Sequence, residues 1–415
     1  MIGRPFEAQI GKVAHGGHCV TRYDGRVVFV RHALPGELVR VQITDGRAGD
    51  RFLLGDAVEV LKASEHRVDP ACPFSGPGRC GGCDWQHCEL TYQRELKAAV
   101  VAEQFHRLAR LDVDVSVEGL PGDEQGLRWR TRTEFAIDAS GSAGLHRHHS
   151  HEIIPVDDCL ISTERVIGTG VLDHRWPMAT SVDVVDASGE PRAVTVPLPA
   201  GDSTAPQVTE RVDTGGWAAD FRVSARGFWQ VHPKAATTYV RHVLAELSPQ
   251  PGERALDLYA GAGLFALALA DAVGPTGAVL AIEWDARAIA DARANLARHP
   301  EIELRRGKVD RGLKPLVRQG IRTDLVVLDP PRTGAGRSVI GDLAALAPRA
   351  IAYVACDPAA LARDVAYARD AGYGIRSLRA FDAFPQTHHI ECIAILEPMP
   401  SGAMPSEANP SGAVE

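Results

Sequence analysis

The sequence lacks any long apolar run. No stretch approaches the roughly 20 consecutive apolar residues that a membrane-spanning helix needs. The first residues, MIGRPFEAQIGKV, also lack the apolar core of a secretion signal. We therefore expect a cytoplasmic protein that has no membrane partner.

Positive charge is not in excess either. The 415 residues include 45 Lys and Arg against 53 Asp and Glu, which gives a formal net charge of -8. This balance argues against a surface coated in positive charge for unspecific nucleic-acid binding, although it permits a local basic groove. The content of 45% hydrophobic and 24% charged residues is typical of a globular protein with a sizeable core. The length predicts two or three domains, and we expect a monomer.

Disulfide bonds are not expected, because a cytoplasmic protein is kept in a reducing compartment. The eight cysteines are therefore expected to bind metal, to take part in catalysis or to be buried. Residues 63–92 are rich in Cys, Gly and Pro and show no periodicity, so something other than a hydrophobic core must hold this loop together. Three thiols in the loop and one far downstream fit either an iron–sulfur cluster or a structural zinc ion. The expected ligands are Cys72, Cys80, Cys83 and Cys159. Cys88 lies close to the first three in the sequence and is the alternative ligand.

The order of periodic segments predicts the domain organisation. Residues 1–62 alternate apolar and polar positions between glycine-containing turns, which predicts a small β-barrel of a kind that often binds nucleic acid. Residues 90–111 carry apolar side chains every three and four positions and predict a helix. From residue 226 strands and helices alternate, which is typical of a doubly wound α/β domain with a largely parallel sheet.

The predicted fold class is therefore α/β, with a C-terminal Rossmann-like domain behind a small barrel and a β-rich middle domain. The Pro-containing end of the chain, composed of small and polar residues, is predicted to be a disordered tail. The expected units are the barrel (1–62), the cysteine-rich loop (63–92), a central α+β unit (93–225), the Rossmann-like domain (226–397) and the tail (398–415).

A cofactor site is predicted in the run RALDLYAGAGLFALALA, which combines a buried strand, a tight turn and a helix. Gly261 and Gly263 allow the backbone to approach a ligand, and the first N–H groups of the helix can receive its polar atoms. The turn also fits the dinucleotide fingerprint, with Glu283 placed for ribose hydroxyls. Asp257 and Asp329 shift the prediction toward S-adenosylmethionine, because an acid ahead of the turn suits a cationic methionine and repels a pyrophosphate. A nicotinamide or flavin dinucleotide is the alternative.

Reactive side chains are predicted at neighbouring strand ends. Asp329 ends the apolar strand LVVL before two prolines that stiffen the loop, and Cys356 ends the strand IAYVA. Ligands of open α/β sheets bind at the carboxyl edge, so we expect both residues to converge there with the glycine turn. A lone strand-end cysteine is more often a buried small residue, but this shared edge favours a reactive thiol. Glu391 begins the apolar run ECIAIL, where an acid is costly unless paired with an arginine or used in chemistry.

These motifs resemble those of the uracil-5-methyltransferase family of RNA-modifying enzymes. The resemblance lies in FWQVH, DLYAGAGLF, LDPPR with VACDP, and HHIECIAIL. The first 62 residues resemble the TRAM barrel of members that act on ribosomal RNA, and the four cysteines are similar to the family's 4Fe–4S site. The resemblance implies a class I methyltransferase fold, S-adenosylmethionine, an iron–sulfur cluster with a structural or RNA-contacting role, and an RNA partner. It favours 23S rRNA, with tRNA as the alternative.

The resemblance also implies roles for single residues. Carbon 5 of uracil is a poor nucleophile, and addition of a thiolate at carbon 6 turns it into an enolate carbon that can attack a methyl group. By resemblance, Cys356 adds to carbon 6 and Glu391 then removes the proton from carbon 5. Asp329 and Gln230 are expected to contact the uracil edge and the cofactor. The full expected cofactor set is Gln230, Tyr259, Gly261, Gly263, Glu283 and Asp329.

Two expectations concern the rest of the chain. Arg128, Arg130 and Arg132 are candidates for phosphate contact, with a solvated strand face as the alternative. Lys308 departs from the family pattern, because an acidic or amide residue is expected near the adenine. A rival hypothesis is an RNA-binding or assembly factor with an idle catalytic domain, but the intact set of reactive side chains argues against it.

Overall fold

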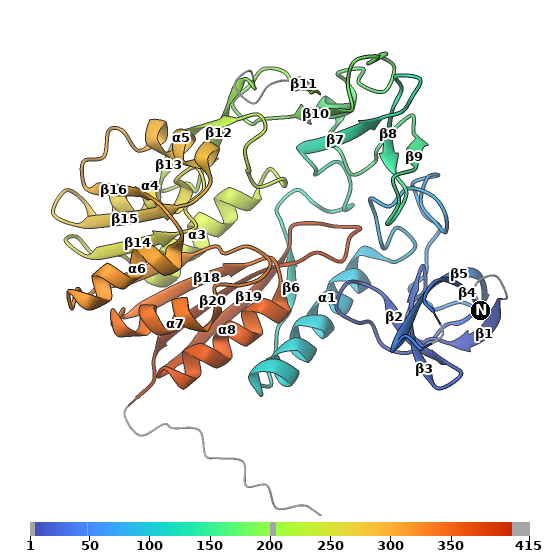
Figure 1. Ribbon diagram of the computed structural model, residues 1–415, viewed down its shortest axis with the longest axis horizontal. Coiled ribbons are helices and arrows are strands. Elements are labelled where there is room, and N and C mark those ends of the chain that lie inside the picture. The colour runs from blue at the N-terminus through green and yellow to red at the C-terminus, as the bar shows by residue number, and fades with distance from the viewer. Residues whose placement is uncertain (1–4, 48, 200–204, 401–415) are drawn as a thin grey trace, which may run out of the picture.

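The computed structural model describes residues 5–47, 49–199 and 205–400 (Figure 1). From residue 401 on, the expected tail lies outside this described part. The N-terminal strands form a five-stranded sheet in the order β1-β4-β5-β3-β2. Its alternating apolar residues, such as Val28 and Val41, are buried in one core. The strands are β1 (Phe6–Gln9), β2 (Cys19–Tyr23), β3 (Arg26–Arg31), β4 (Leu38–Asp45) and β5 (Phe52–Lys62).

The cysteine-rich loop follows the barrel and leads into a helix. Residues 63–89 form no helix or strand. The predicted helix is present as α1 (Leu90–Gln104), which continues into a π-helical turn, η1 (Phe105–Ala109). Apolar residues of α1 and η1 pack in the same core as the C-terminal helices, and β6 (Val117–Gly119) pairs in parallel with the C-terminal strand β19. In packing terms, residues 90–119 join the C-terminal domain, while Leu96 and Val100 of α1 also pack in the barrel core.

The middle of the chain is a second five-stranded sheet, in the order β11-β10-β7-β8-β9. Phe135 and Val182 lie in the apolar core on one of its faces. A separate hairpin, β12 with β13, packs against helices of the C-terminal domain. The elements are β7 (Arg132–Ile137), β8 (Ala143–His146), β9 (Ile153–Pro155), α2 (Glu164–Ile167), β10 (Ser181–Val185), β11 (Val194–Leu198), β12 (Gln207–Asp213) and β13 (Ala218–Ser224).

The C-terminal domain is built on an eight-stranded sheet in the order β16-β15-β14-β17-β18-β20-β19-β6. Strands β14 to β18 are parallel, whereas β20 runs antiparallel to both of its neighbours. The strands are β14 (Arg254–Leu258), β15 (Ala278–Glu283), β16 (Ile302–Arg306), β17 (Leu325–Leu328), β18 (Ala350–Ala355), β19 (Tyr373–Asp382) and β20 (Glu391–Pro398).

Helices cover both faces of this sheet. One core joins the sheet to α3, α4 and α5, and the other joins it to α6, α7, α8 and α1 (Figure 1). This arrangement confirms the predicted α/β fold class. Among the described residues, no helix is both long and apolar enough to cross a bilayer. The helices are α3 (Ala235–Leu247), α4 (Leu264–Val273), α5 (Ala286–Asn295), α6 (Val309–Arg318), α7 (Gly336–Ala345) and α8 (Pro358–Asp370).

Candidate active site

Asp329, Cys356 and Glu391 lie at the ends of three adjacent strands. Asp329 directly follows β17 and Cys356 directly follows β18. In the antiparallel pair of β18 and β20, Ala355 is opposite Cys392. Continuing this register by one residue places Cys356 opposite Glu391. The convergence expected from the strand ends is therefore present in the structure.

The two acids at this edge influence each other. Glu391 is buried, and burial together with the charge of Asp329 raises the pKa of Glu391 well above its usual value. Burial likewise raises the pKa of Asp329 to about 7. The charge that acts on Glu391 is thus that of another acid and not that of an arginine. Two neighbouring carboxyl groups in such a place hold at least one proton between them near neutral pH.

The thiol of Cys356 is protonated in this environment. Burial raises its pKa to about 11, with further contributions from the negative charges of Glu391 and Asp329. Arg332, in the loop after β17, opposes this shift because its positive charge favours the thiolate. The thiol therefore needs a partner that removes its proton, or a cation nearby, before it can act as a nucleophile.

The glycine turn between β14 and α4 has the backbone conformation of a ligand-binding turn. Tyr259, Gly261 and Gly263 have φ values of 63°, 56° and 92°. A Cβ placed on Gly261 would meet no atom within 4 Å, so space above the turn is open. Glu283 accepts a hydrogen bond from the Gly261 N–H at 2.9 Å. This carboxylate therefore lies beside the open turn, where the sequence predicts a ribose contact.

Asp257 lies elsewhere than expected. It was expected to face a bound methionine, but only 1% of the residue is exposed. Its carboxylate accepts a hydrogen bond from the Ala266 N–H at 2.7 Å. Within a buried strand, the first turn of α4 offers the donor that an acid requires. Asp257 therefore fastens the helix to the sheet and does not line the open side of the turn.

Trp284, next to Glu283, is a candidate ligand contact that the sequence did not point to, and it lies beside Lys308, which the sequence places near the adenine. The side chain of Trp284, directly after the acid, is 60% exposed. The ammonium group of Lys308 lies 5.6 Å from the centre of the Trp284 ring. An aromatic residue after the strand-ending acid in AIEW was the available signal, because a large exposed ring beside a ligand turn offers a stacking surface.

The barrel reaches Cys356, which no sequence pattern indicated. A cavity of about 80 Å³ beside Cys356 is lined by the barrel residues His15, Gly16 and Gly17 and by Lys97 of α1. Nε2 of His15 lies 3.1 Å from a carboxylate oxygen of Asp357, the residue after Cys356. The N-terminal barrel therefore forms part of the wall around the thiol of Cys356.

The cysteine-rich loop also contacts the catalytic loop, which we define as residues 384–390, the segment before Glu391. The backbone N–H groups of Asp84 and Trp85 both donate to the carbonyl oxygen of Gln386, at 2.9 and 3.0 Å. The indole N–H of Trp85 donates to the Gly17 carbonyl oxygen at 3.0 Å. One segment thus connects the barrel loop with the loop that leads into the proposed base.

The four cysteines of the predicted cluster line one cavity of about 270 Å³. The N–H of Gly82 donates to the sulfur of Cys80 at 3.4 Å, and the Gln86 side-chain amide donates to the sulfur of Cys83 at 3.5 Å. Cys88 instead packs in the barrel core, as does Cys19, and Cys392 is buried in β20. In the described part of the chain, no three His, Cys, Asp or Glu side chains are placed to share a single metal ion.

The three arginines considered for phosphate contact have different surroundings. Arg128 forms an ion pair with Asp158 at 2.6 Å, and Arg132 forms one with Glu210 at 2.7 Å in a largely buried position. Arg130 donates to a backbone carbonyl and lines the cysteine cavity. Gln230 lies half-buried in the loop between β13 and α3.

Comparison with known proteins agrees with these features. Residues 204–399 match the model of the tRNA (uracil-5-)-methyltransferase family, and residues 1–58 match the TRAM domain. An uncharacterized RNA methyltransferase of Streptomyces coelicolor is 48% identical over 440 residues, covering 97% of this chain and 94% of its own length. One of Bifidobacterium longum is 37% identical over 416 residues, covering 94% of this chain and 96% of its own.

A solved structure shares the fold over most of the chain. The crystal structure of Pyrococcus abyssi tRNA (uracil-54, C5)-methyltransferase in complex with S-adenosyl-L-homocysteine has a TM-score of 0.67 at 22% identity. The similarity covers 94% of this chain and 99% of the archaeal one. The family and the TRAM domain expected from the motifs are thereby confirmed. The chain belongs to the RNA uracil-5-methyltransferase family, as a member with an N-terminal TRAM domain.

Proposed function

We propose that this methyltransferase acts on carbon 5 of a uridine in RNA through a covalent adduct, with Cys356 as nucleophile and Glu391 as base. The position of Cys356 opposite Glu391, across the β18–β20 pair, carries the proposal. Asp329 at the next strand end and the glycine turn complete a single site at the carboxyl edge of the sheet.

The chemistry requires both a nucleophile and a base. The sulfur of Cys356 bonds to carbon 6 of the uracil, and the electrons of the C5–C6 double bond move into an enolate over carbons 5 and 4. S-adenosylmethionine, when bound, supplies the methyl group that carbon 5 attacks. The ionised form of Glu391, which is a stronger base because burial and Asp329 raise its pKa, then takes the proton from carbon 5. The C5–C6 double bond forms again, and the sulfur leaves as a thiolate.

The resting site must lose the thiol proton before addition. Cys356 holds this proton, because burial and the acids raise the pKa of its thiol to about 11. Arg332 is the cation that favours the thiolate. Asp329 and Gln230 are proposed to contact the uracil edge, which would hold carbon 6 against the sulfur and exclude water from it.

The cofactor is proposed to lie over the glycine turn. Glu283 would accept hydrogen bonds from ribose hydroxyls, because its carboxylate already receives the Gly261 N–H beside the open space. Tyr259 and Gly263 shape the same turn. The exposed indole of Trp284 offers a face on which an adenine can stack.

We further propose that Cys72, Cys80, Cys83 and Cys159 hold a 4Fe–4S cluster. The four side chains surround a cavity instead of meeting at one point, which suits a cluster of several atoms better than a zinc ion. The N–H groups on two of the sulfurs fit cluster ligands, since such bonds tune iron–sulfur centres. A cluster here would fix the loop that contacts the catalytic loop.

Iron and acid-labile sulfide measured in anaerobically purified protein test this cluster. Cys159→Ala should lose both together with the visible absorption of the cluster. Cys88→Ala is the control and should keep them, because Cys88 packs in the barrel core. Zinc bound in place of iron and sulfide would contradict the proposal.

The substrate RNA is proposed to be 23S rRNA, supported by the resemblance of the barrel and the four-cysteine set to family members that act on ribosomal RNA. A tRNA is the second candidate, because the fold matches that of an archaeal tRNA methyltransferase over most of both chains. Arg130 is the candidate for phosphate contact, since Arg128 and Arg132 already pair with acids. Nucleoside mass spectrometry with site mapping, on RNA from a deletion strain, separates the two: the missing 5-methyluridine lies in one RNA or the other.

The adduct tests the mechanism directly. A Glu391→Gln variant mixed with substrate RNA should accumulate a protein–RNA adduct that survives denaturation, because the proton on carbon 5 stays in place. Cys356→Ser should form no adduct and should lose methylation. Full methylation by Cys356→Ser would show that the nucleophile is assigned wrongly.

A further inference from the structure

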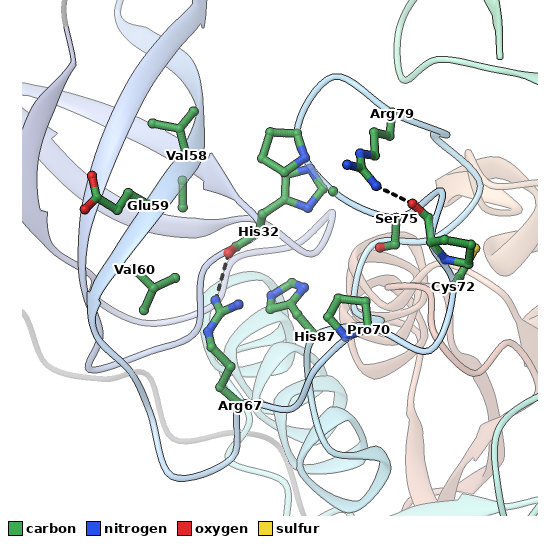
Figure 2. Close-up of a pocket in the computed structure, with 14 residues that line it drawn as sticks. His32, Val58, Glu59, Val60, Arg67, Pro70, Cys72, Ser75, Arg79 and His87 are labelled. Carbon is green, nitrogen blue, oxygen red and sulfur yellow. Dashed lines mark hydrogen bonds between the residues drawn. The ribbon is translucent and has the colours of Figure 1, made fainter.

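A cavity of about 550 Å³ lies between the barrel and the cysteine-rich loop, apart from the proposed catalytic centre. Figure 2 shows Val58, Glu59 and Val60 of β5 on one side and Cys72 with Ser75 on the loop opposite. The walls are largely apolar, because the loop contributes prolines at several positions and the strand contributes valines. The proposed methyl transfer does not account for this space, and of the four proposed cluster ligands Cys72 alone is among its lining residues.

Two buried imidazoles line the cavity, and each has one ring nitrogen to consider, its Nε2. His32 is 8% exposed and His87 is 3% exposed, and their ring centres lie 6.1 Å apart. Within the part of the chain that the structure describes, neither Nε2 atom has a hydrogen-bond partner. A buried polar atom without a partner costs about 1–3 kcal/mol, so each nitrogen would be stabilised by a ligand that forms a hydrogen bond with it.

The backbone at His32 supports a functional role. Its φ of 60° lies in the left-handed region, which a residue with a side chain seldom adopts. The carbonyl oxygen of His32 accepts a hydrogen bond from Arg67 at 2.8 Å, which fixes this conformation (Figure 2). Strain of this kind collects at sites where a side chain must be held toward a ligand.

The charges around the cavity favour a neutral ligand. Burial lowers the pKa of His32 to about 3 and that of His87 to about 4, with help from the charges of Arg31 and Arg67 respectively, so both rings are neutral. The guanidinium of Arg67 is already paired with the carboxylate of Glu37 at 2.5 and 2.7 Å. The guanidinium of Arg79 donates to the carbonyl oxygen of Pro73. A phosphate would find these cations engaged, whereas a flat neutral heterocycle fits apolar walls and imidazole nitrogens.

We propose that this cavity binds an unpaired nucleobase of the substrate RNA, at a position other than the target uridine. The faces of the base would lie against the valines and prolines, and its edge would share hydrogen bonds with Nε2 of His32 and His87. Proteins read single-stranded RNA in this way, through bases that leave the stack. The identity of the ligand rests on the proposed RNA substrate, and the cavity stands beside the TRAM barrel.

Nuclear magnetic resonance tests the proposal. The full-length protein is labelled with ¹⁵N in its imidazoles, and the signals of its histidines are followed. The probes are adenosine, guanosine, cytidine, uridine, inorganic phosphate and zinc ion, each added alone. Substitutions His32→Gln and His87→Gln assign the two signals. At least one nucleoside should shift both signals, and phosphate and zinc should not.

A matched pair of variants locates the binding. Val58 lines the mouth of the cavity and is 42% exposed, so Val58→Trp should fill the space without disturbing the barrel core. Leu61, similarly exposed on the same strand, is not among the residues that line the cavity, and Leu61→Trp is the control. Val58→Trp should weaken nucleoside binding about tenfold, the scale of one stacked base, and Leu61→Trp should leave it unchanged.

Three results would overturn the inference: no nucleoside shifts the two signals, phosphate or zinc shifts them, or both tryptophan variants weaken binding equally. None of these measurements requires methyl transfer. An error in the assignment of Cys356 would therefore leave them unaffected, and the two proposals can fail separately.

Discussion

The carboxylate of Asp84 accepts a hydrogen bond from Nδ1 of His388 at 2.7 Å and a second from the His388 backbone N–H at 3.1 Å. Arg31 of the barrel lies 3.5 Å from its other oxygen. Although burial opposes ionisation, the hydrogen bonds and charge of His388, together with Arg31, hold the pKa of Asp84 well below its usual range. One ionised acid thus joins the barrel, the cysteine-rich loop and the catalytic loop.

Asp84→Asn should loosen the catalytic loop. An amide oxygen can still accept from both His388 donors, but the amide carries no charge and turns its NH2 group toward Arg31. A charge-assisted hydrogen bond is worth about 1.5–3 kcal/mol. We expect a lower melting temperature and a turnover reduced about tenfold, measured with S-adenosylmethionine at saturation. Asp69→Asn, an exposed acid in the same cysteine-rich loop, is the control and should change neither. Unchanged turnover in Asp84→Asn would show that the loop is held by other contacts.

Gly17→Ala should separate the barrel loop from the catalytic loop. A Cβ on Gly17 would lie 2.5 Å from the Cβ of His388, so one of the two segments must move. Gly25→Ala is a matched control, because Gly25 has a φ of 76°, close to the 81° of Gly17, and a Cβ there would meet no atom within 4 Å. Both variants carry the same backbone strain, and only Gly17→Ala should lose most of its methylation activity. Equal activities in the two variants would show that the barrel loop is not needed at the site.

The sheet edge of this site was predictable from the sequence, whereas the walls were not. Strand ends at Asp329 and Cys356 are visible as apolar runs that stop at a reactive side chain, and parallel strands bring such ends together. The contacts of Gly17 and Asp84 with His388 join positions about 300 or more residues apart. No local period or turn signal encodes a contact of that kind, because it depends on how complete domains pack.

The sequence also misplaced one acid and gave no sign of one strand, for physical reasons. Asp257 was assigned to the ligand side, but an acid inside a buried strand takes the nearest free donors, here the first turn of α4. The strand β6 joins the C-terminal sheet with three residues, too few to show an alternating pattern. Its partner, β19, lies more than 250 positions downstream.

Lys97→Met should destabilise the protein strongly. The ammonium of Lys97 and the carboxylate of Asp382 are 2.5 Å apart, and both side chains are fully buried. Loss of the cation leaves Asp382 with Arg94 alone, at 3.2 Å, and breaking a buried pair from one side costs about 3–5 kcal/mol. Because Arg94 still pairs with Asp382, we expect a loss at the lower end of this range. The free energy of unfolding, measured with urea, should fall by about 3 kcal/mol.

Lys12→Met is the control for this loss. Lys12 pairs with Glu103 at 2.7 Å, but its side chain is 70% exposed. Such a surface pair contributes about 1 kcal/mol or less. If Lys97→Met and Lys12→Met lower the free energy of unfolding equally, the buried pair of Lys97 and Asp382 contributes no more to stability than a pair at the surface.

Arg332→Gln should slow the reaction of Cys356 with iodoacetamide. Because burial and the neighbouring acids raise the thiol pKa to about 11, the thiolate fraction at pH 8 is roughly one in a thousand. It should rise about tenfold per pH unit until the pH approaches that pKa, and the rate of alkylation should rise with it. Arg332 favours the thiolate, so its loss should raise the thiol pKa further and lower the rate several-fold at every pH below it.

The alkylation is measured by mass spectrometry of the Cys356 peptide, since other cysteines also react. Arg337→Gln is the matched control, because Arg337 is an exposed arginine in the next helix, stacked on Tyr367 and paired with Asp370. It should leave the rate unchanged. A flat rate between pH 7 and pH 9 would show that the thiol is already ionised, and an equal effect of the two substitutions would show that Arg332 acts only through the overall charge of the protein. In the expected case, Arg332 increases the fraction of Cys356 that is present as thiolate at a given pH, against the larger effect of burial.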